Sequence, residues 1–398
     1  MPYVEAMTVH DADTHIMELP DCLDPYLEPK HRDALKARFQ GSRRERAEDT
    51  SWADKAVARH EDPEFRAEAG ENIMLRKLYD AMGSFRKEDR GAALDHLGFA
   101  SQLVFTTFCL GNFGLDDSED TELCYAAAQA HNRMMADFCG VDRRLLGTAY
   151  IPLADRERAP RFAQEAIEAG AKALMIPSKC PKGHSPSHTD FDKLWAVAQE
   201  AGLPIIFHVG GQEKMNTDYA RNGLPAQLDW LGGAENFTSV SFLSIPNSVM
   251  QTMATLIFDG VLDRFPKLQF GAVELGASWV PSWMRFMDAS FEAFHKEERL
   301  QHLRARPSEI VRQQFKATPY CHEDAGWIIS QGGGEVAMFS SDYPHREGGR
   351  NPMKRFIDSL NQHAVSEADR QRFFRDNFIE LMGKGLDVSL HDRALQAA

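Results

Sequence analysis

The sequence lacks any apolar run close to the ~20 residues that a membrane-spanning helix needs, and it does not begin with a basic segment followed by a long apolar stretch. We therefore expect no membrane span and a cytoplasmic location. The six cysteines are scattered and form no CxxC pair, so neither a disulfide framework nor a cysteine zinc site is indicated. Basic residues are also in deficit, 45 against 59 acidic ones, and a net charge of −14 disfavours binding to nucleic acids and to anionic membranes.

A nucleotide-binding glycine motif is missing as well, because no Gly-x-Gly-x-x-Gly follows any early strand pattern. This absence argues against an open, doubly wound nucleotide-binding sheet. The remaining composition is that of an ordinary soluble globular protein, with 43% hydrophobic and 26% charged residues. A chain of 398 residues is long enough for one large barrel-type domain or for two domains, and composition alone does not decide between these.

Short apolar runs alternate with amphipathic helical patterns along the chain. Such runs, each expected to be a strand buried on both faces, lie at residues 6–15, 101–108, 145–152, 171–177, 203–208, 268–274, 314–318 and 336–342. Helical patterns between them lie at residues 122–138, 159–169, 191–201 and 248–265. Eight strands alternating with helices predict an α/β protein with a (β/α)8 TIM-type barrel spanning residues 1–398 as a single domain, and chemistry at the carboxyl ends of the strands.

The region from residue 19 to residue 98 departs from this alternation. It is polar and charge-rich, and its apolar residues are sparse and irregularly spaced. Such a pattern favours short surface helices over a part of the barrel wall. We interpret residues 19–98 as a helical insertion after the first strand, which serves as a lid or as an oligomer contact.

Polar side chains that close apolar runs are the candidates for chemistry: Asp13, His15, His208, Glu274 and Asp342. Asp13 and His15 are two positions apart on one strand, so both side chains point to the same side. Imidazole nitrogens and carboxylate oxygens that converge at a barrel mouth are suitable ligands for a divalent metal ion. Taken alone, His208 is better explained as a hydrogen-bonded interior histidine and Asp342 as the start of a turn. All five residues together favour a metal site.

These motifs, in this order, resemble the amidohydrolase superfamily. The resemblance rests on Asp-x-His at 13–15, Phe207-His208, the run from Glu274 to Pro281 and the run from Phe339 to His345. More narrowly, the chain resembles the amidohydrolase-related branch that includes aminocarboxymuconate semialdehyde decarboxylase and the resorcylate and carboxyvanillate decarboxylases. The resemblance extends over nearly the whole chain, except residues 19–98 and the tail after about residue 384. It implies a barrel that binds one divalent ion, Zn²⁺ or Mn²⁺, through Asp13, His15, His208 and Asp342.

Two positions depart from the family pattern. Many members have a histidine where this chain has Asp13, and an oxygen ligand makes Mn²⁺ competitive with Zn²⁺. The family usually has a strand-six histidine near the substrate, where this chain has Glu274, and a glutamate needs a shifted pKa to act as a histidine does. The resemblance implies a non-oxidative decarboxylase of a small aromatic or unsaturated carboxylic acid. Asp342 would deliver the proton, with Glu274 and His208 as further catalytic residues.

Weaker candidates for contacts with the substrate are His322, His345 and Arg346. The expected partner is a small carboxylic acid, and the family implies a homodimer or homotetramer. A second hypothesis is a metal-dependent hydrolase that opens an amide, lactone or carbon–carbon bond with metal-activated water. Lys172 begins the fourth strand and does not end it, so the carboxylated lysine of binuclear hydrolases has no counterpart. A third hypothesis, a binding protein without catalysis, predicts that metal removal leaves function unchanged.

Overall fold

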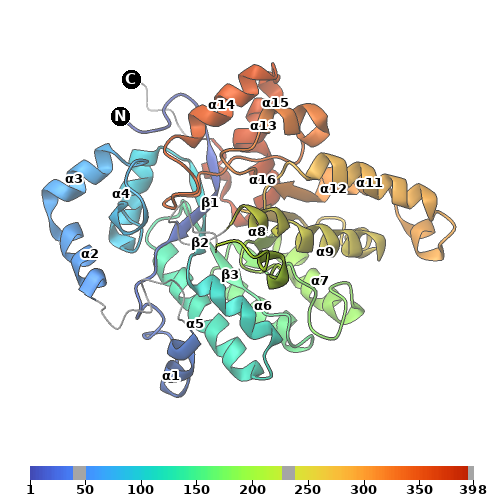
Figure 1. Cartoon of the computed structure of the whole chain (residues 1–398), viewed down its shortest axis with the longest axis horizontal. Coiled ribbons are helices and arrows are strands. Elements are labelled where there is room, and N and C mark those ends of the chain that lie inside the picture. Colours follow the sequence, from blue (N-terminus) through green and yellow to red (C-terminus); the bar gives the residue numbers. More distant parts are fainter. Residues whose placement is uncertain (39–50, 226–237, 393–398) are drawn as a thin grey trace.

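The chain folds around one curled parallel sheet (Figure 1). The computed structural model describes residues 1–38, 51–225 and 238–392. Within them, seven strands pair in sequence order, from β1 to β7. Their bounds are β1 His10–Ile16, β2 Ser101–Thr106, β3 Leu145–Tyr150, β4 Ala173–Met175, β5 Ile205–His208, β6 Phe270–Val273 and β7 Phe315–Ala317. Among the described helices, none has the length and apolar character needed to cross a bilayer.

The segment 336–342, which the sequence predicts as an eighth strand, forms only isolated bridges. Ala337 bridges Ala317 of β7 in parallel, and Tyr343 bridges Thr14 of β1. In addition, the Ala12 N–H of β1 donates a hydrogen bond to the Phe339 carbonyl at 3.2 Å. The segment therefore lies between the last and the first strand of the sheet. This arrangement is an α/β fold consistent with a TIM-type barrel.

Helices follow most strands and cover the outside of the sheet (Figure 1). The predicted helical stretches correspond to α5 Thr121–Cys139, α6 Arg158–Glu168, α7 Asp192–Ala201 and α9 Asn247–Phe258, with α10 Val261–Arg264. The prediction of one helix over 248–265 was wrong in one respect, because Gly260 adopts a left-handed φ of +72° and separates α9 from α10. The other described α-helices that follow β2 are α8 Ser239–Ser244, α11 Val280–Ala293, α12 Pro307–Gln314, α13 Ala325–Ile328, α14 Pro352–Gln362, α15 Glu367–Gln371 and α16 Asn377–Met382.

Between β1 and β2 the described residues contain four helices. They are α1 Pro29–Arg38, α2 Ser51–Glu61, α3 Pro63–Glu71 and α4 Lys87–Leu97, and residues 39–50 lie outside the described part. Figure 1 places α2 and α3 on the side of the molecule opposite α11. The loop between α3 and α4 returns to the barrel mouth, where the Leu78 N–H donates to the Pro344 carbonyl at 2.9 Å.

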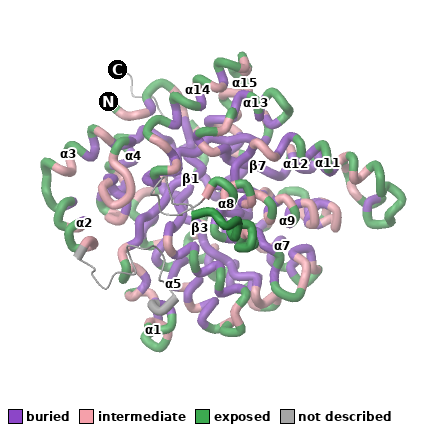
Figure 2. The backbone as a smooth tube through the Cα atoms, viewed as in Figure 1, coloured by how far each residue is buried: buried purple, intermediate pink, exposed green. Residues whose placement is uncertain are grey.

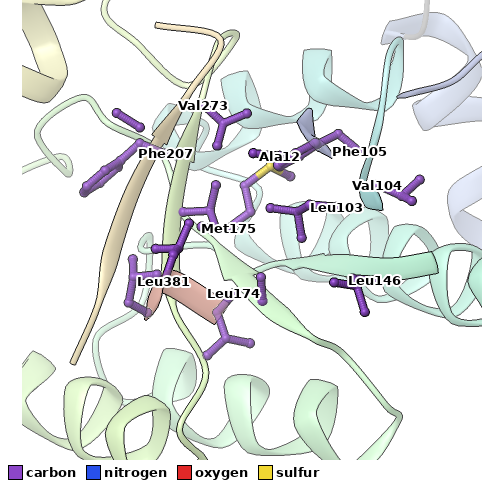
Figure 3. Close-up of a cluster of buried hydrophobic side chains, with 14 of the residues drawn as sticks. Ala12, Leu103, Val104, Phe105, Leu146, Leu174, Met175, Phe207, Val273 and Leu381 are labelled. Carbon is purple, nitrogen blue, oxygen red and sulfur yellow. The ribbon is translucent and has the colours of Figure 1, made fainter. Parts of the chain in front are cut away.

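The strands are buried on both faces of the sheet (Figure 2), and those such as β5 and β6 are correspondingly apolar. Figure 3 shows part of this core, where side chains from β2, β4, β5 and β6 pack together. The ring of Phe207 on β5 stacks on Phe270 of β6 at 6.2 Å, and Trp195 of α7 covers Phe270 from outside at 6.0 Å. Full burial of a side chain of this size stabilises the fold by roughly 1.5–3 kcal/mol. The core therefore holds the strand ends at fixed positions.

One buried histidine outside the candidate site makes the stability of the fold depend on pH. His131 of α5 lies against the Thr106 hydroxyl at 3.1 Å, and burial lowers its pKa to about 4. An unfolded histidine titrates near 6.5, so between pH 6.5 and 4 the unfolded chain binds a proton that the folded chain does not, and stability falls as pH falls. We expect this residue to remove about 2 kcal/mol of stability between pH 7 and pH 5.

Urea unfolding of metal-free wild type and His131→Gln at both pH values measures this effect. The variant should lose about 2 kcal/mol less than wild type over the same interval. His302→Gln is the matched control, because His302 is exposed. Parallel pH dependences of wild type and His131→Gln would contradict the assignment.

Candidate metal centre

The first two residues of the site come from β1. A bulge shifts the pairing of β1 with β2 between Asp11 and Thr14, and inserts one extra residue into β1. Bulges of this kind re-aim side chains and are common beside active sites. Asp13 lies within this bulge and His15 follows it, and both are buried, with 1% and 0% of their surface exposed. The His15 Nε2 atom lies 3.2 Å from Asp13 Oδ1, so the two side chains face a common point as the sequence predicts.

The two histidines are held in one tautomer by backbone carbonyls. Nδ1 of His15 donates to the carbonyl of Thr106 at 2.9 Å, and Nδ1 of His208 donates to the carbonyl of Val209 at 3.1 Å. A carbonyl only accepts, so Nδ1 carries the proton in each ring and Nε2 of the neutral ring keeps its lone pair. Both Nε2 atoms therefore point into the site in the form that a metal ion requires.

Glu274 follows β6 directly. Asp342 is the last residue of the segment 336–342, which lies between β7 and β1 in the sheet. Both have left-handed backbones, with φ of +55° and +51°, which is uncommon for residues other than glycine. The turn at Glu274 is held by Tyr320, whose hydroxyl donates to the Glu274 carbonyl at 2.6 Å, and by the Thr318 hydroxyl, which accepts from the Glu274 N–H at 3.0 Å. Non-glycine residues in this conformation persist where the surrounding contacts fix them, often at functional sites.

Asp342 is positioned by contacts with β1. Its N–H donates to the Asp13 carbonyl at 2.9 Å. The buried Asp11 carboxylate accepts from the N–H and the hydroxyl of Ser341 at 2.8 and 2.5 Å. A Cβ on Gly348 would lie 2.1 Å from the Ser341 carbonyl oxygen, so only glycine fits there. The loop that carries Asp342 is thus fixed against the strand that carries Asp13.

Together these side chains form one buried cluster of possible metal ligands. Ligand atoms of Asp13, His15, His208 and Glu274 all lie within 4.8 Å of one another. A second overlapping group consists of His15, Glu274, Asp342 and His345. The Glu274 Oε2 atom lies 3.5 Å from His15 Nε2 and 3.4 Å from His208 Nε2. Two imidazole lone pairs and several carboxylate oxygens in a buried site match the donor set of a divalent transition metal ion.

The charges in this cluster act on one another strongly. Burial alone would raise the pKa of Asp13, but hydrogen bonds and charge from His15 and His208 hold it well below its usual range. Burial and the nearby charge of Asp13 raise the pKa of Asp342 to about 7. Asp342 is therefore the carboxyl group of the site that can hold a proton near neutral pH.

His345 lies deeper than the sequence suggests, with no exposed surface. Its Nδ1 is 2.9 Å from Asp342 Oδ1, and its Nε2 is 2.8 Å from the hydroxyl of Thr107. That hydroxyl donates to the Ile16 carbonyl at 2.8 Å, so it accepts the Nε2–H of His345. Burial, followed by the charge of His15, lowers the pKa of His345 well below its usual value. The arrangement places a neutral imidazole beside the Asp342 carboxyl group.

The other two predicted contact residues lie outside the cluster. His322 is exposed, and its ring stacks on Tyr320 at 5.5 Å, while Phe242 of α8 lies 5.5 Å from the His322 ring. The Tyr320 hydroxyl reaches Glu274, so these aromatic rings lie near one side of the site. Arg346 is exposed and forms no ion pair with a residue that the structure describes.

Two residues near the site were missed by the sequence analysis. Glu18 is buried, and its carboxylate accepts the N–H groups of Thr107, Phe108 and Cys109 at 3.0–3.2 Å, which fixes the loop after β2. Its position just beyond the end of β1 was the only available signal. Lys77 lies in the loop between α3 and α4, and the strongest charge acting on its amine is Asp342. No periodic pattern in the sequence marks this lysine.

Comparison with protein families finds one match over most of the chain. A family model described as amidohydrolase matches residues 11–383. No protein among the curated sequences matches the chain.

Solved structures share the fold at low identity. An amidohydrolase from Mycobacterium avium subsp. paratuberculosis K-10 is 22% identical, with a TM-score of 0.72 over 96% of this chain and 100% of that chain. A 5-carboxyvanillate decarboxylase from Novosphingobium aromaticivorans, in complex with manganese and 4-hydroxy-3-methoxy-5-nitrobenzoic acid, is 17% identical, with a TM-score of 0.59 over 95% and 96%. A dihydroxybenzoic acid decarboxylase from Polaromonas sp. JS666, with manganese and 2-nitroresorcinol, is 14% identical, with a TM-score of 0.58 over 95% and 97%.

Proposed function

Because this chain belongs to the amidohydrolase family, we propose that it is a metal-dependent, non-oxidative decarboxylase of a small aromatic or unsaturated carboxylic acid. The observation that carries the proposal is the buried cluster of two histidines and three carboxylates at the strand ends. Two decarboxylases of the same fold bind manganese and a small aromatic ligand, which supports the choice of reaction and of metal.

Asp13, His15, His208 and Asp342 would hold one divalent ion, Mn²⁺ or Zn²⁺. Glu274 lies 3.4 Å from His208 Nε2, the same distance as Asp13, and 3.5 Å from His15 Nε2, so it would be a further ligand and not only a substitute for the family's strand-six histidine. Oxygen ligands in this number favour Mn²⁺ over Zn²⁺. The ion would act as a Lewis acid that stabilises negative charge as CO₂ leaves.

Residues of the chain would donate the proton that replaces CO₂ on the substrate carbon. When the bond between the ring carbon and the carboxylate breaks, its electron pair stays on the carbon, and a proton from the Asp342 carboxyl group forms the new C–H bond. Before a metal ion binds, burial and the charge of Asp13 raise the pKa of Asp342 to about 7, and its Oδ1 lies 2.9 Å from His345 Nδ1, so this carboxyl group is suited to carry a proton. His345 lies 2.9 Å away and would hold this carboxyl group in place. Asp342 would regain its proton from solvent after the product leaves.

For the architecture we propose a single (β/α)8 barrel domain over residues 1–398. The segment 336–342 would take the place of the eighth strand, because it bonds to both β7 and β1. Residues 19–98 would be an insertion that covers the barrel mouth or contributes an oligomer contact, in a homodimer or a homotetramer. The hydrogen bond between Leu78 and Pro344 supports the first of these roles.

A metal-dependent hydrolase is the second candidate. The family description and the Mycobacterium structure both carry the name amidohydrolase, which favours it. In that reaction Asp342 would accept a proton from the attacking water. A binuclear site is disfavoured, because Lys172 precedes β4 and so lies at the amino end of that strand, away from the cluster.

CO₂ release distinguishes these functions. The purified protein is stripped of metal, reloaded with one equivalent of Mn²⁺ or Zn²⁺, and incubated with hydroxybenzoates, 5-carboxyvanillate and muconate-type acids. We expect metal-dependent CO₂ release from at least one acid, faster with Mn²⁺. A parallel panel of amides and lactones tests the hydrolase. If neither metal form releases CO₂ from any acid, the decarboxylase proposal fails.

A further inference from the structure

Lys77 places a buried amine next to the metal-ligand cluster. Its Nζ atom is inaccessible to solvent and has no hydrogen-bond partner among the described residues. Burial lowers the pKa of Lys77, and Asp342 is the strongest charge that opposes this shift. The neighbouring Leu78 N–H donates to the Pro344 carbonyl, so the lysine lies near the loop that follows the segment 336–342. The buried amine of Lys316, by comparison, lies 2.8 Å from a Glu380 carboxylate oxygen, whereas Lys77 forms no such ion pair with the described residues.

The backbone holds Lys77 in this position. Leu78 has a left-handed φ of +56°, which is rare for a bulky side chain, and its N–H donates to the Pro344 carbonyl at 2.9 Å. On the other side, the Tyr79 hydroxyl donates to the Glu18 carbonyl at 2.9 Å. Because both anchors lie on segments that carry the site, the strained turn fixes Lys77 relative to Asp342.

The negative charge of the metal-ligand cluster explains why a basic group beside it would help an anionic substrate to bind. Asp13, Glu274 and Asp342 are all buried, so the site has three carboxyl groups beside His15 and His208. A divalent ion balances only two negative charges, and an ionised third carboxylate would repel an organic acid that enters the site. When protonated, the buried Lys77 amine, which has no hydrogen-bond partner among the described residues, offsets this repulsion and offers three N–H donors.

We propose that Lys77 is a substrate-binding residue that donates to the anionic group of an organic acid held between its Nζ and the metal-ligand cluster. This inference rests on the proposed function only in taking an organic acid as the substrate. It replaces Arg346 as the residue that recognises the carboxylate, since Arg346 is exposed. The Lys77 Nζ would attract the negative charge of an organic acid, and a neutral molecule of the same shape would lack this attraction.

The test compares an anionic probe with a neutral probe of nearly the same shape, 2-hydroxybenzoate and 2-hydroxybenzamide. Their binding to the Mn²⁺-loaded full-length protein is measured by isothermal titration calorimetry for wild type, Lys77→Met and Lys77→Arg. Lys267→Met is the matched control, because Lys267 is exposed. We expect wild type to prefer the benzoate, and Lys77→Met to bind the benzoate about 10- to 100-fold more weakly, with less than a twofold change for the benzamide. Lys77→Arg should regain part of the preference.

Metal content and the thermal midpoint, measured on the same samples, separate binding from structure. If Lys77→Met loses metal or stability while the ratio of the two affinities stays as in wild type, Lys77 only balances charge and the proposal is overturned. Wild type that binds both probes equally, or binds neither at millimolar concentration, overturns it as well. The experiment needs no turnover, so a failed CO₂ assay with an intact benzoate preference would reject decarboxylation and retain this inference.

Discussion

Asp342→Asn is expected to lower kcat for CO₂ release about 10³-fold while the bound metal and the fold stay close to wild type. Asparagine has nearly the same shape and keeps one oxygen that faces the site, but it cannot carry the proton that the product carbon needs. The raised pKa of Asp342, about 7, is the property that the substitution removes. The measurements are kcat with the best acid of the panel, metal content by mass spectrometry and the thermal midpoint.

The control for this substitution is Asp358→Asn. Asp358 is exposed on α14 and pairs with Lys354, so its loss should leave kcat unchanged. If Asp342→Asn retained more than a tenth of the wild-type kcat with full metal content, the proton would come from another group. His345, 2.9 Å from Asp342, would be the next candidate.

His208→Asn is expected to reduce bound metal from about one ion per chain to less than a tenth after dialysis, and activity with it. The substitution removes one of the two imidazole lone pairs that face the cluster, and the shorter amide side chain does not reach the same point. Loss of a residue that merely orients a ligand commonly costs 10- to 100-fold in metal affinity, so loss of a ligand should cost at least about 100-fold.

Metal content after dialysis and competition with a chromophoric chelator measure this effect. His302→Asn is the control, because its side chain is exposed. A His208→Asn protein that still binds one ion per chain with wild-type affinity would show that the carboxylates and His15 suffice, and would remove His208 from the ligand set.

The position of the cluster could be predicted from the sequence because the signal is local. Asp13, His15, His208 and Asp342 each stand at the end of an apolar run, and in parallel strands these ends meet at one edge of the sheet. The order of strands in the sheet follows their order in the chain, so no long-range information was needed to bring them together.

Three features could not be predicted, for physical reasons. Glu274 itself was predicted as a site residue, but the left-handed backbone that turns it toward the histidines is not revealed by periodicity. Lys77 lies near the cluster through the tertiary placement of a loop, which is held by the contacts of Leu78 with Pro344 and of Tyr79 with Glu18. The segment 336–342 has the composition of a strand but bonds to its neighbours only at isolated positions, which depends on the geometry of closure and not on its residues.

The contact between Asp11 and Ser341 joins residues 330 positions apart in the sequence. A ribosome that adds about 5–20 residues per second needs roughly 15 to 70 s to make the chain between them. During that time β1 has emerged, but its partner segment does not yet exist, so Asp13 and His15 cannot form the complete site. Capture of the proposed metal ion would therefore be one of the last events in the maturation of this enzyme, and a chain that stalls before residue 342 would be released without the complete ligand cluster.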